Sequence, residues 1–248
     1  MDYKLIFVEG LPGTGKTTLS ERIYRLLVSK GVKTTLLLED DGRIPCNFYC
    51  IAGIPKNKYM NFSDDKSFIT ETENYFYINM NGCDNKIKEQ LQLYDIGDEF
   101  NKAVSLQEYI RCTLEWWRYW VANNINDTVL VLDSAFLQCP INEMIFRGAS
   151  DEEAISYIQS IAEITKPYSP FCIYLRRQSA EIAIDFAKVV KGEQWAKGIE
   201  GMAETNFSDL FNRRFKLEQM LLSSIPSFVC DINGNDWSDA EVKIQNII

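Results

Sequence analysis

The sequence predicts an α/β fold in which helices cover both faces of a five-stranded parallel sheet. Two observations predict it: short apolar segments recur five times along the 248 residues, and helical patterns separate them. The segments are apolar almost throughout, which is typical of strands that are buried on both faces. We predict strands at residues 3–8, 34–38, 128–134, 171–177 and 227–232.

The expected helices follow from apolar spacing and from capping residues. Apolar residues recur at helical spacing from Leu19 to Leu27, and Gly31 provides a stop. Ser105 and Ser150 each lie three residues before a glutamate, which predicts two capping boxes. We therefore expect helices at 15–30, 105–123 and 150–165, with others near 141–147, 180–190, 207–224 and after 238.

Residues 40–104 interrupt this alternation of strands and helices. They contain prolines, glycines and a cluster of aromatic residues: Phe48, Tyr49, Tyr59, Phe62, Phe68, Tyr75, Phe76 and Tyr77. A long insertion in a compact domain usually carries function, so we expect this one to shape the site of a substrate. Residues 191–206 are a polar stretch after the fourth strand and form a candidate lid. No linker or repeat is evident, so we expect residues 1–248 to form one domain.

Composition disfavours several kinds of partner. The formal charge of −9 and the pI near 4.8 are unfavourable for binding nucleic acid or an anionic membrane surface, so we expect neither. No apolar stretch approaches the length of about 20 residues that a membrane span requires, and the start does not resemble a signal peptide. The seven cysteines form no Cys-x-x-Cys pair and are typical of reduced thiols, so we expect a cytoplasmic protein.

Histidine is absent from the chain. This excludes Ser-His-Asp and Cys-His nucleophiles and nearly all zinc sites that use imidazole. A general base must then be a carboxylate or, less often, a lysine, tyrosine or cysteine.

The most specific motif follows the first predicted strand and opens the first predicted helix. Residues 10–17 match the pattern Gly-x-x-x-x-Gly-Lys-[Ser/Thr], in which backbone N–H groups and the helix start bind phosphates. In this motif Lys16 contacts the β and γ phosphates of a nucleotide and Thr17 binds Mg²⁺. We expect ATP and Mg²⁺ as ligands, with the nucleotide contacted by Gly10, Leu11, Pro12, Gly13, Thr14, Gly15, Lys16, Thr17 and Thr18.

The residues around this motif resemble the thymidylate kinase and deoxynucleoside kinase group of P-loop proteins. The resemblance rests on Val8-Glu9-Gly10, where an acid precedes the first glycine, and on Gly15-Lys16-Thr17-Thr18. The order of elements is also similar, with a substrate insertion after the second strand and a lid after the fourth. More loosely, the chain is similar to uncharacterised bacterial P-loop kinase-like proteins at residues 36–39, 94–95, 116–117 and 133–140.

Acidic residues end two of the predicted strands, at the edge of a parallel sheet where ligands bind. Asp133 ends an apolar strand, and Mg²⁺ with its waters would stabilise this buried acid; hydrogen bonding to the backbone is the alternative. Glu39 follows the second strand, where the resemblance implies a carboxylate that accepts the proton of the acceptor hydroxyl. Asp40 is the nearest rival for this role, and an acidic loop that faces water is the other interpretation.

The arginines depart from the pattern of the kinases that the chain resembles. Those kinases usually have an arginine directly after the acid of the third strand and more arginines in the lid, whereas this chain has Ser134 and a lid without arginine. Arg176 and Arg177, at the end of the fourth strand, are the best-placed groups to neutralise charge on the transferred phosphoryl group. Asn233, after the fifth strand, is expected to contact the nucleotide base; a tight turn is the alternative.

These features favour an ATP- and Mg²⁺-dependent phosphotransferase that moves the γ-phosphoryl group to a small molecule. Candidate acceptors are nucleosides, nucleotides and hydroxyl-bearing metabolites or antibiotics. The acidic end of the second strand suits an uncharged or cationic hydroxyl compound better than a nucleoside monophosphate. One alternative is a nucleotide-dependent switch or regulatory NTPase without an acceptor, and another is a nucleotide-binding protein that has lost catalysis. The sequence leaves open whether the chain forms a homodimer.

Overall fold

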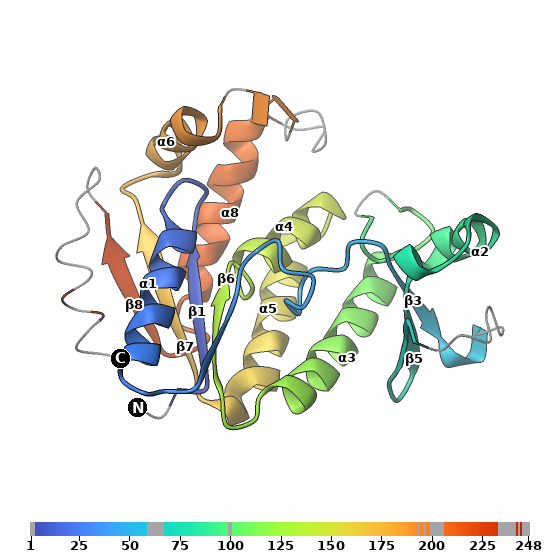
Figure 1. The fold of residues 1–248 in the computed structure, drawn as a ribbon. Coiled ribbons are helices and arrows are strands. Elements are labelled where there is room, and N and C mark those ends of the chain that lie inside the picture. The colour runs from blue at the N-terminus through green and yellow to red at the C-terminus, as the bar shows by residue number, and fades with distance from the viewer. Residues whose placement is uncertain are drawn as a thin grey trace.

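The main sheet of the protein is five-stranded and parallel. The computed structural model describes residues 3–58, 67–98, 101–192, 194–195, 197–198, 206–232, 242 and 244. The strands lie in the order β2-β6-β1-β7-β8, and helices cover both faces, so the predicted fold class is confirmed (Figure 1). These strands are β1 Leu5–Gly10, β2 Thr34–Leu37, β6 Val129–Asp133, β7 Pro170–Arg176 and β8 Ser227–Asp231.

The helices outside the insertion lie near their expected places in the chain, whereas the insertion contains a helix, α2, that the sequence did not predict. They are α1 Lys16–Ser29, α2 Asn85–Leu91, α3 Leu106–Asn124, α4 Gln138–Phe146, α5 Asp151–Thr165, α6 Ala180–Lys191 and α8 Phe207–Leu221. Short 3₁₀ turns occur at Lys56–Lys58, Met80–Gly82, Gln92–Tyr94 and Lys166–Tyr168. Asn233, most of the candidate lid and, apart from residues 242 and 244, the helix expected after residue 238 lie outside the described residues.

Successive side chains of β1 point to opposite faces of the sheet. Leu5 and Phe7 are fully buried in a core that also includes apolar residues of α3, α5 and α8. Ile6 and Val8 are fully buried in a second core with apolar residues of α1. This alternation directs Glu9 to the same face as Phe7, away from α1.

Capping residues set where the helices begin. Ser150 with Glu153 forms the expected capping box. At Ser105 only half of the expected box is present: the Ser105 side chain accepts a hydrogen bond from the N–H of Glu108, but the Glu108 side chain accepts from Tyr75 and Arg111 instead. Helix α4 begins three residues earlier than predicted, at Gln138. Pro140 is tolerated there because it lies in the first turn, where backbone N–H groups have no partner within the helix.

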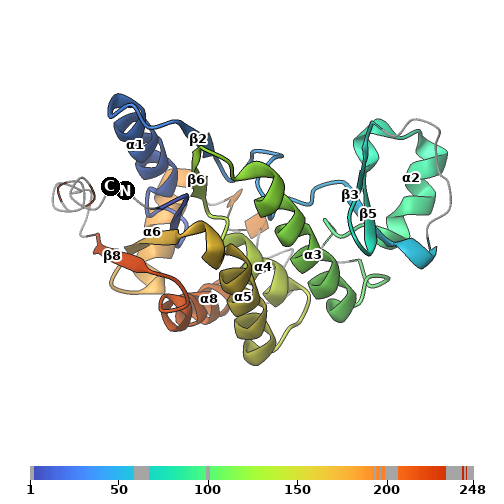
Figure 2. The same ribbon diagram turned by 90° about the horizontal axis from the view of Figure 1, so that it is seen from below.

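The insertion contains a second sheet that the sequence did not predict. β3 Ile51–Pro55, β5 Tyr75–Asn79 and β4 Ile69–Glu71 form an antiparallel sheet in the order β3-β5-β4. The strands have three to five residues each, too short for their apolar alternation to stand out. Figure 2 shows this sheet and α2 at the end of the molecule beyond α3, opposite α1.

Helix α3 connects the insertion to the main core. Trp117 and Trp120 are buried in that core. Trp116 is partly buried, and its ring centroid lies 4.9 Å from that of Tyr77 in β5. Apolar residues of the insertion, of α3 and of the main sheet therefore belong to one continuous core.

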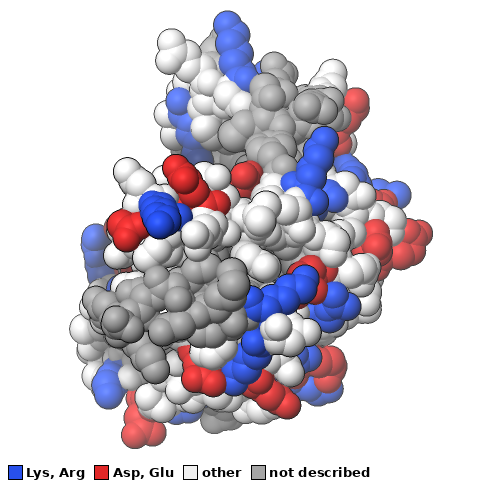
Figure 3. Space-filling model, turned by 90° about the vertical axis from the view of Figure 1, so that its right-hand side faces the viewer, with Lys and Arg blue, Asp and Glu red and all other residues white. Residues whose placement is uncertain are grey.

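On the described part of the face that carries the insertion, basic and acidic side chains are interspersed (Figure 3). All seven cysteines are free thiols, and five of them are buried. Among the described residues, no helix has both the length and the apolar character needed to cross a membrane.

Candidate functional site

The glycine-rich loop, residues 10–17, connects the carboxyl end of β1 to α1. Its backbone conformation requires glycine at Gly13, where φ is +77° and a Cβ atom would lie 2.9 Å from the backbone of Ala187 in α6. Thr14 Oγ1 donates a 2.8 Å hydrogen bond to the carbonyl of Leu11 across the loop. The loop is therefore held in shape by its own contacts and by the close approach of α6.

Lys16 is buried at the first turn of α1. Its Nζ donates to the Leu11 carbonyl at 3.2 Å. Burial lowers the pKa of Lys16, and the nearby Arg214 lowers it further, whereas the carboxylates of Asp133, Glu39 and Glu9 oppose the shift. A buried ammonium group in this position gains from an anionic ligand, because an anion would stabilise its charged form.

Asp133 ends β6 directly beside the loop, since Val8 of β1 lies opposite it in the sheet. It is fully buried, and its Oδ2 accepts a 2.7 Å hydrogen bond from the Thr17 hydroxyl while Oδ1 accepts one of 2.9 Å from Ser134. Burial raises the pKa of Asp133, and Lys16 together with both hydroxyl groups opposes this shift. The expected neighbourhood of Thr17 and Asp133 is present.

The pair fits the ligand chemistry of Mg²⁺, which takes one or two protein oxygens and keeps water or phosphate oxygens at its other positions. Within the described residues, no group of three or more His, Cys, Asp or Glu side chains could hold a metal ion. A metal at Asp133 would therefore take the Thr17 hydroxyl and, as far as the described residues go, water or phosphate oxygens as its other ligands.

Glu9 anchors the turn between β6 and α4. It is fully buried, and its two carboxylate oxygens accept hydrogen bonds from the backbone N–H groups of Phe136 at 2.7 Å and Gln138 at 3.0 Å. Burial raises the pKa of Glu9 to about 7, although these N–H groups oppose the shift. The acid before the first glycine thus shapes the backbone that leads into α4.

Glu39 follows β2 and lies at a cavity of about 270 Å³ between the insertion and α4. Gln138 Nε2 donates a 2.6 Å hydrogen bond to Glu39 Oε1. Asp40 is exposed, and Asp41 is paired with Arg43 at 2.7 Å. The other residues that line the cavity are Cys46, Asn47, Phe48, Tyr49, Gly97, Cys139, Asn142, Glu143 and Phe146.

The two arginines at the end of β7 point to different places. Arg176 forms a two-point ion pair with Asp231 of β8, at 2.6 and 3.0 Å, and is partly exposed. Arg177 is buried, with its guanidinium 4.1 Å from the ring of Phe186 in α6 and its Nη2 3.5 Å from the Gly13 carbonyl. The fold brings Arg177 to the glycine-rich loop and leaves Arg176 at the β8 side of the sheet.

Sequence reasoning missed Arg214, a fully buried arginine in α8. Its Nη2 donates to the carbonyl of Gly10 at 3.0 Å and to Gln138 Oε1 at 2.9 Å, and its Nε pairs with Glu218 at 2.6 Å. Burial disfavours the charge of Arg214, but Glu218 offsets this and its pKa is raised. A signal was present in the sequence, because Arg214 occupies the same helical stripe as the buried Leu210, Leu217 and Leu221.

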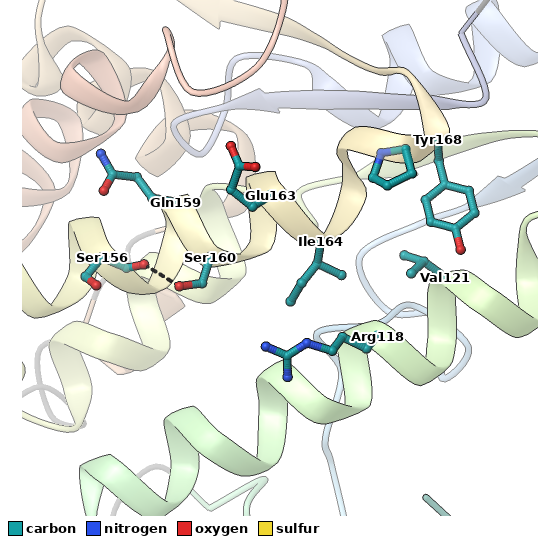
Figure 4. A pocket seen from close by; sticks show the side chains of 9 residues that line it. Arg118, Val121, Ser156, Gln159, Ser160, Glu163, Ile164 and Tyr168 are labelled. Carbon is teal, nitrogen blue, oxygen red and sulfur yellow. Dashed lines mark hydrogen bonds between the residues drawn. The ribbon is translucent and has the colours of Figure 1, made fainter. Parts of the chain in front are cut away.

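A larger cavity, of about 690 Å³, lies between α3 and α5 (Figure 4). Residues of both helices line it, including Arg118 and Ile164, together with Pro167 and Tyr168 just before β7. It therefore lies at the amino end of β7, whereas the glycine-rich loop follows the carboxyl end of β1. In a parallel sheet these are opposite edges, so this cavity is not part of the site around Lys16.

Comparison of the chain with models of known protein families gave no match, and comparison with curated proteins gave none either.

Proposed function

We propose that this protein is an ATP- and Mg²⁺-dependent phosphotransferase that moves the γ-phosphoryl group to a small-molecule acceptor. The observation that carries the proposal is that Lys16 and the Thr17–Asp133 pair lie at the glycine-rich loop within electrostatic range of Glu39, which lines a cavity. Nucleotide and acceptor would then meet at the carboxyl edge of the sheet, where parallel α/β proteins bind ligands.

The glycine-rich loop and the start of α1 would hold the phosphates through backbone N–H groups. Lys16 would neutralise charge on the β and γ phosphates, and Thr17 and Asp133 would hold the metal ion. When bound, Mg²⁺ supplies further neutralisation of the phosphate oxygens. Arg177, beside the Gly13 carbonyl, is the guanidinium best placed to assist these groups.

Glu39 would accept the proton of the acceptor hydroxyl. The hydroxyl oxygen then forms a bond to the γ phosphorus, the bond from phosphorus to the bridging oxygen breaks, and ADP leaves with its electron pair. Catalysis of this kind relies mainly on positioning and charge neutralisation. The cavity beside Glu39 supplies the space in which an acceptor can be held for this step.

The lining of this cavity favours an acceptor without a phosphate group. Its charged lining residues are Glu39 and Glu143, and its amides are Asn47 and Asn142, whereas no lysine or arginine lines it within the described residues. A nucleoside monophosphate would need a cationic clamp for its phosphate. An uncharged or cationic hydroxyl compound, such as a nucleoside, a sugar or an aminoglycoside, fits this lining better.

The proposal places the protein in the cytoplasm. Its free thiols, most of them buried, suit a reducing compartment where ATP is available.

The test is release of ADP in a coupled assay with a panel of nucleosides, nucleotides, sugars and aminoglycosides. One acceptor class should stimulate turnover, and Lys16→Ala should abolish it. Lys30→Ala, which replaces an exposed lysine at the end of α1, is the matched control and should keep full activity.

Two results would contradict the proposal. Steady ATP hydrolysis that no acceptor stimulates would favour a switch or regulatory NTPase. ATP binding without any turnover would favour a nucleotide-binding protein that has lost catalysis.

A further inference from the structure

The side chain of Gln138, the first residue of α4, connects two parts of the site. Its Nε2 donates to Glu39 Oε1 at 2.6 Å, and its Oε1 accepts from Arg214 Nη2 at 2.9 Å. The orientation of this amide is fixed, because a guanidinium can only donate and a carboxylate can only accept. Gln138 is therefore held between one positive and one negative partner.

Arg214 continues this chain of hydrogen bonds to the glycine-rich loop. The same Nη2 donates to the carbonyl of Gly10, the first residue of the loop, at 3.0 Å. The Arg214 Nε is held by Glu218 at 2.6 Å, and the second oxygen of Glu218 accepts from Tyr174 OH at 2.6 Å. The planar guanidinium is thus fixed on several sides, and one of its edges faces both Gly10 and Gln138.

We propose that Arg214 and Gln138 are positioning residues that hold Glu39 in a fixed relation to the glycine-rich loop. The inference rests on the proposed function in one respect, since that function makes Glu39 the proton acceptor. The bridge runs from Gly10 through Arg214 and Gln138 to Glu39, and so joins the phosphate-binding segment to the group that activates the acceptor. Neither residue contacts the reacting atoms in this scheme.

Stabilisation of the fold alone would not require this arrangement. A buried ion pair such as Arg214–Glu218 often contributes little net stability, because desolvation of both charges offsets their attraction. That pair also uses only the Nε edge of the guanidinium, whereas Nη2 is directed to Gly10 and Gln138. The contacts of Nη2 instead suit a role in aligning two parts of the site.

The test uses the full chain with Arg214→Lys and Gln138→Leu. Arg214→Lys keeps a positive charge for Glu218 but removes the planar fork, and Gln138→Leu breaks the bridge while leaving the Arg214–Glu218 pair intact. Arg213→Lys is the matched control, because Arg213 contacts Asp151 and the carbonyl of Ala149 instead of the site. Thermal unfolding shows whether each variant is folded. If Arg214→Lys does not fold, the conclusion is drawn from Gln138→Leu alone.

Two readouts are measured on each protein. In the coupled ADP assay, kcat should fall at least about tenfold in the two bridge variants while KM for ATP changes little, as expected for a group that acts in the transition state. In ¹³C-glutamate-labelled protein, the NMR signal of the Glu39 carboxyl carbon, assigned by its loss in Glu39→Gln, should move in both bridge variants and stay in place in Arg213→Lys.

The second readout separates this inference from the proposed function. If the wild-type protein transfers no phosphoryl group but the Glu39 signal moves as stated, the proposed function fails and the positioning role stands. If that signal is the same in the wild type and in the folded bridge variants, the positioning inference is overturned, whether or not transfer occurs.

Discussion

The hydroxyl of Thr17 donates a 2.7 Å hydrogen bond to the carboxylate of Asp133, although 116 positions separate the two residues in the chain. The contact arises because β1 and β6 are neighbours, which brings the end of β6 beside the start of α1. A hydroxyl and a carboxylate at this distance offer two oxygen ligands of the kind that Mg²⁺ prefers. The proposed metal site therefore needs both the glycine-rich loop and the end of β6.

In Asp133→Asn, the gain in ATP affinity that Mg²⁺ provides should be smaller than in the wild type by about tenfold or more. The amide keeps the size of the side chain but loses the negative charge that holds the metal. Titration calorimetry with ATP, with and without Mg²⁺, measures this gain. Asp127→Asn, at an exposed position, is the control and should behave as the wild type. Retention of the full Mg²⁺ effect in Asp133→Asn would remove Asp133 from the metal site.

Glu39→Gln should lower acceptor-dependent ADP release by about 100-fold or more, with ATP affinity unchanged. Glutamine can still accept the hydrogen bond of Gln138 but cannot take up a proton from the acceptor. Asp40→Asn is the control, because the neighbouring Asp40 does not line the cavity, and this variant should keep its activity. If Asp40→Asn loses activity and Glu39→Gln does not, Asp40 and not Glu39 is the proton acceptor.

Arg177→Met should lower kcat for transfer by about 100-fold, because a guanidinium beside the loop would be lost where charge develops. Arg176→Met is the matched control from the adjacent position. It removes only the exposed ion pair with Asp231, which is worth at most about 1 kcal/mol, and should leave kcat unchanged. Equal effects of the two substitutions on kcat would count against a special role for Arg177.

Gly13→Ala should weaken ATP binding and lower the free energy of unfolding by about 1 to 3 kcal/mol. The new Cβ would meet the backbone of Ala187, and the positive φ of this position is strained for alanine. Calorimetry and urea denaturation measure the two effects. Gly42→Ala is the control, since no atom lies within 4 Å of a Cβ there. A fully stable Gly13→Ala that binds ATP normally would show that α6 adjusts to the added methyl group.

Glu9 should make stability depend on pH. Its pKa rises from the usual 4.5 to about 7 in the folded protein, so folding favours its protonated form. This contribution is fully present below pH 4.5 and is lost as the pH rises to about 7 and beyond. Relative to Glu9→Gln, which does not titrate, the free energy of unfolding of the wild type should fall by about 3 kcal/mol over this interval.

Urea denaturation at a series of pH values from 4 to about 8.5 measures this difference. Glu163→Gln is the control, because Glu163 forms only an exposed pair with Lys166, and it should follow the wild type. A constant difference between wild type and Glu9→Gln at all pH values would show that Glu9 keeps its ordinary pKa.

The fold class and the position of the glycine-rich loop between the first strand and the first helix could be predicted from the sequence because both depend on local patterns. Buried strands are apolar along their length, helices repeat their apolar residues every three or four positions, and caps such as Ser150 lie at fixed offsets from their partners. The order of elements and the acidic residues at strand ends then predicted Lys16, Glu39 and Asp133 as site residues, and the fold brings these three to one edge of the sheet.

Tertiary structure alone decided the remaining parts of the site. The small sheet of the insertion, the position of Arg177 beside the glycine-rich loop and the bridge through Gln138 all depend on how distant segments pack. Arg214 donates to the carbonyl of Gly10 across 204 positions of the chain. No local spacing encodes such a contact, because it exists only once α8 has packed against the sheet and water has been excluded from both groups.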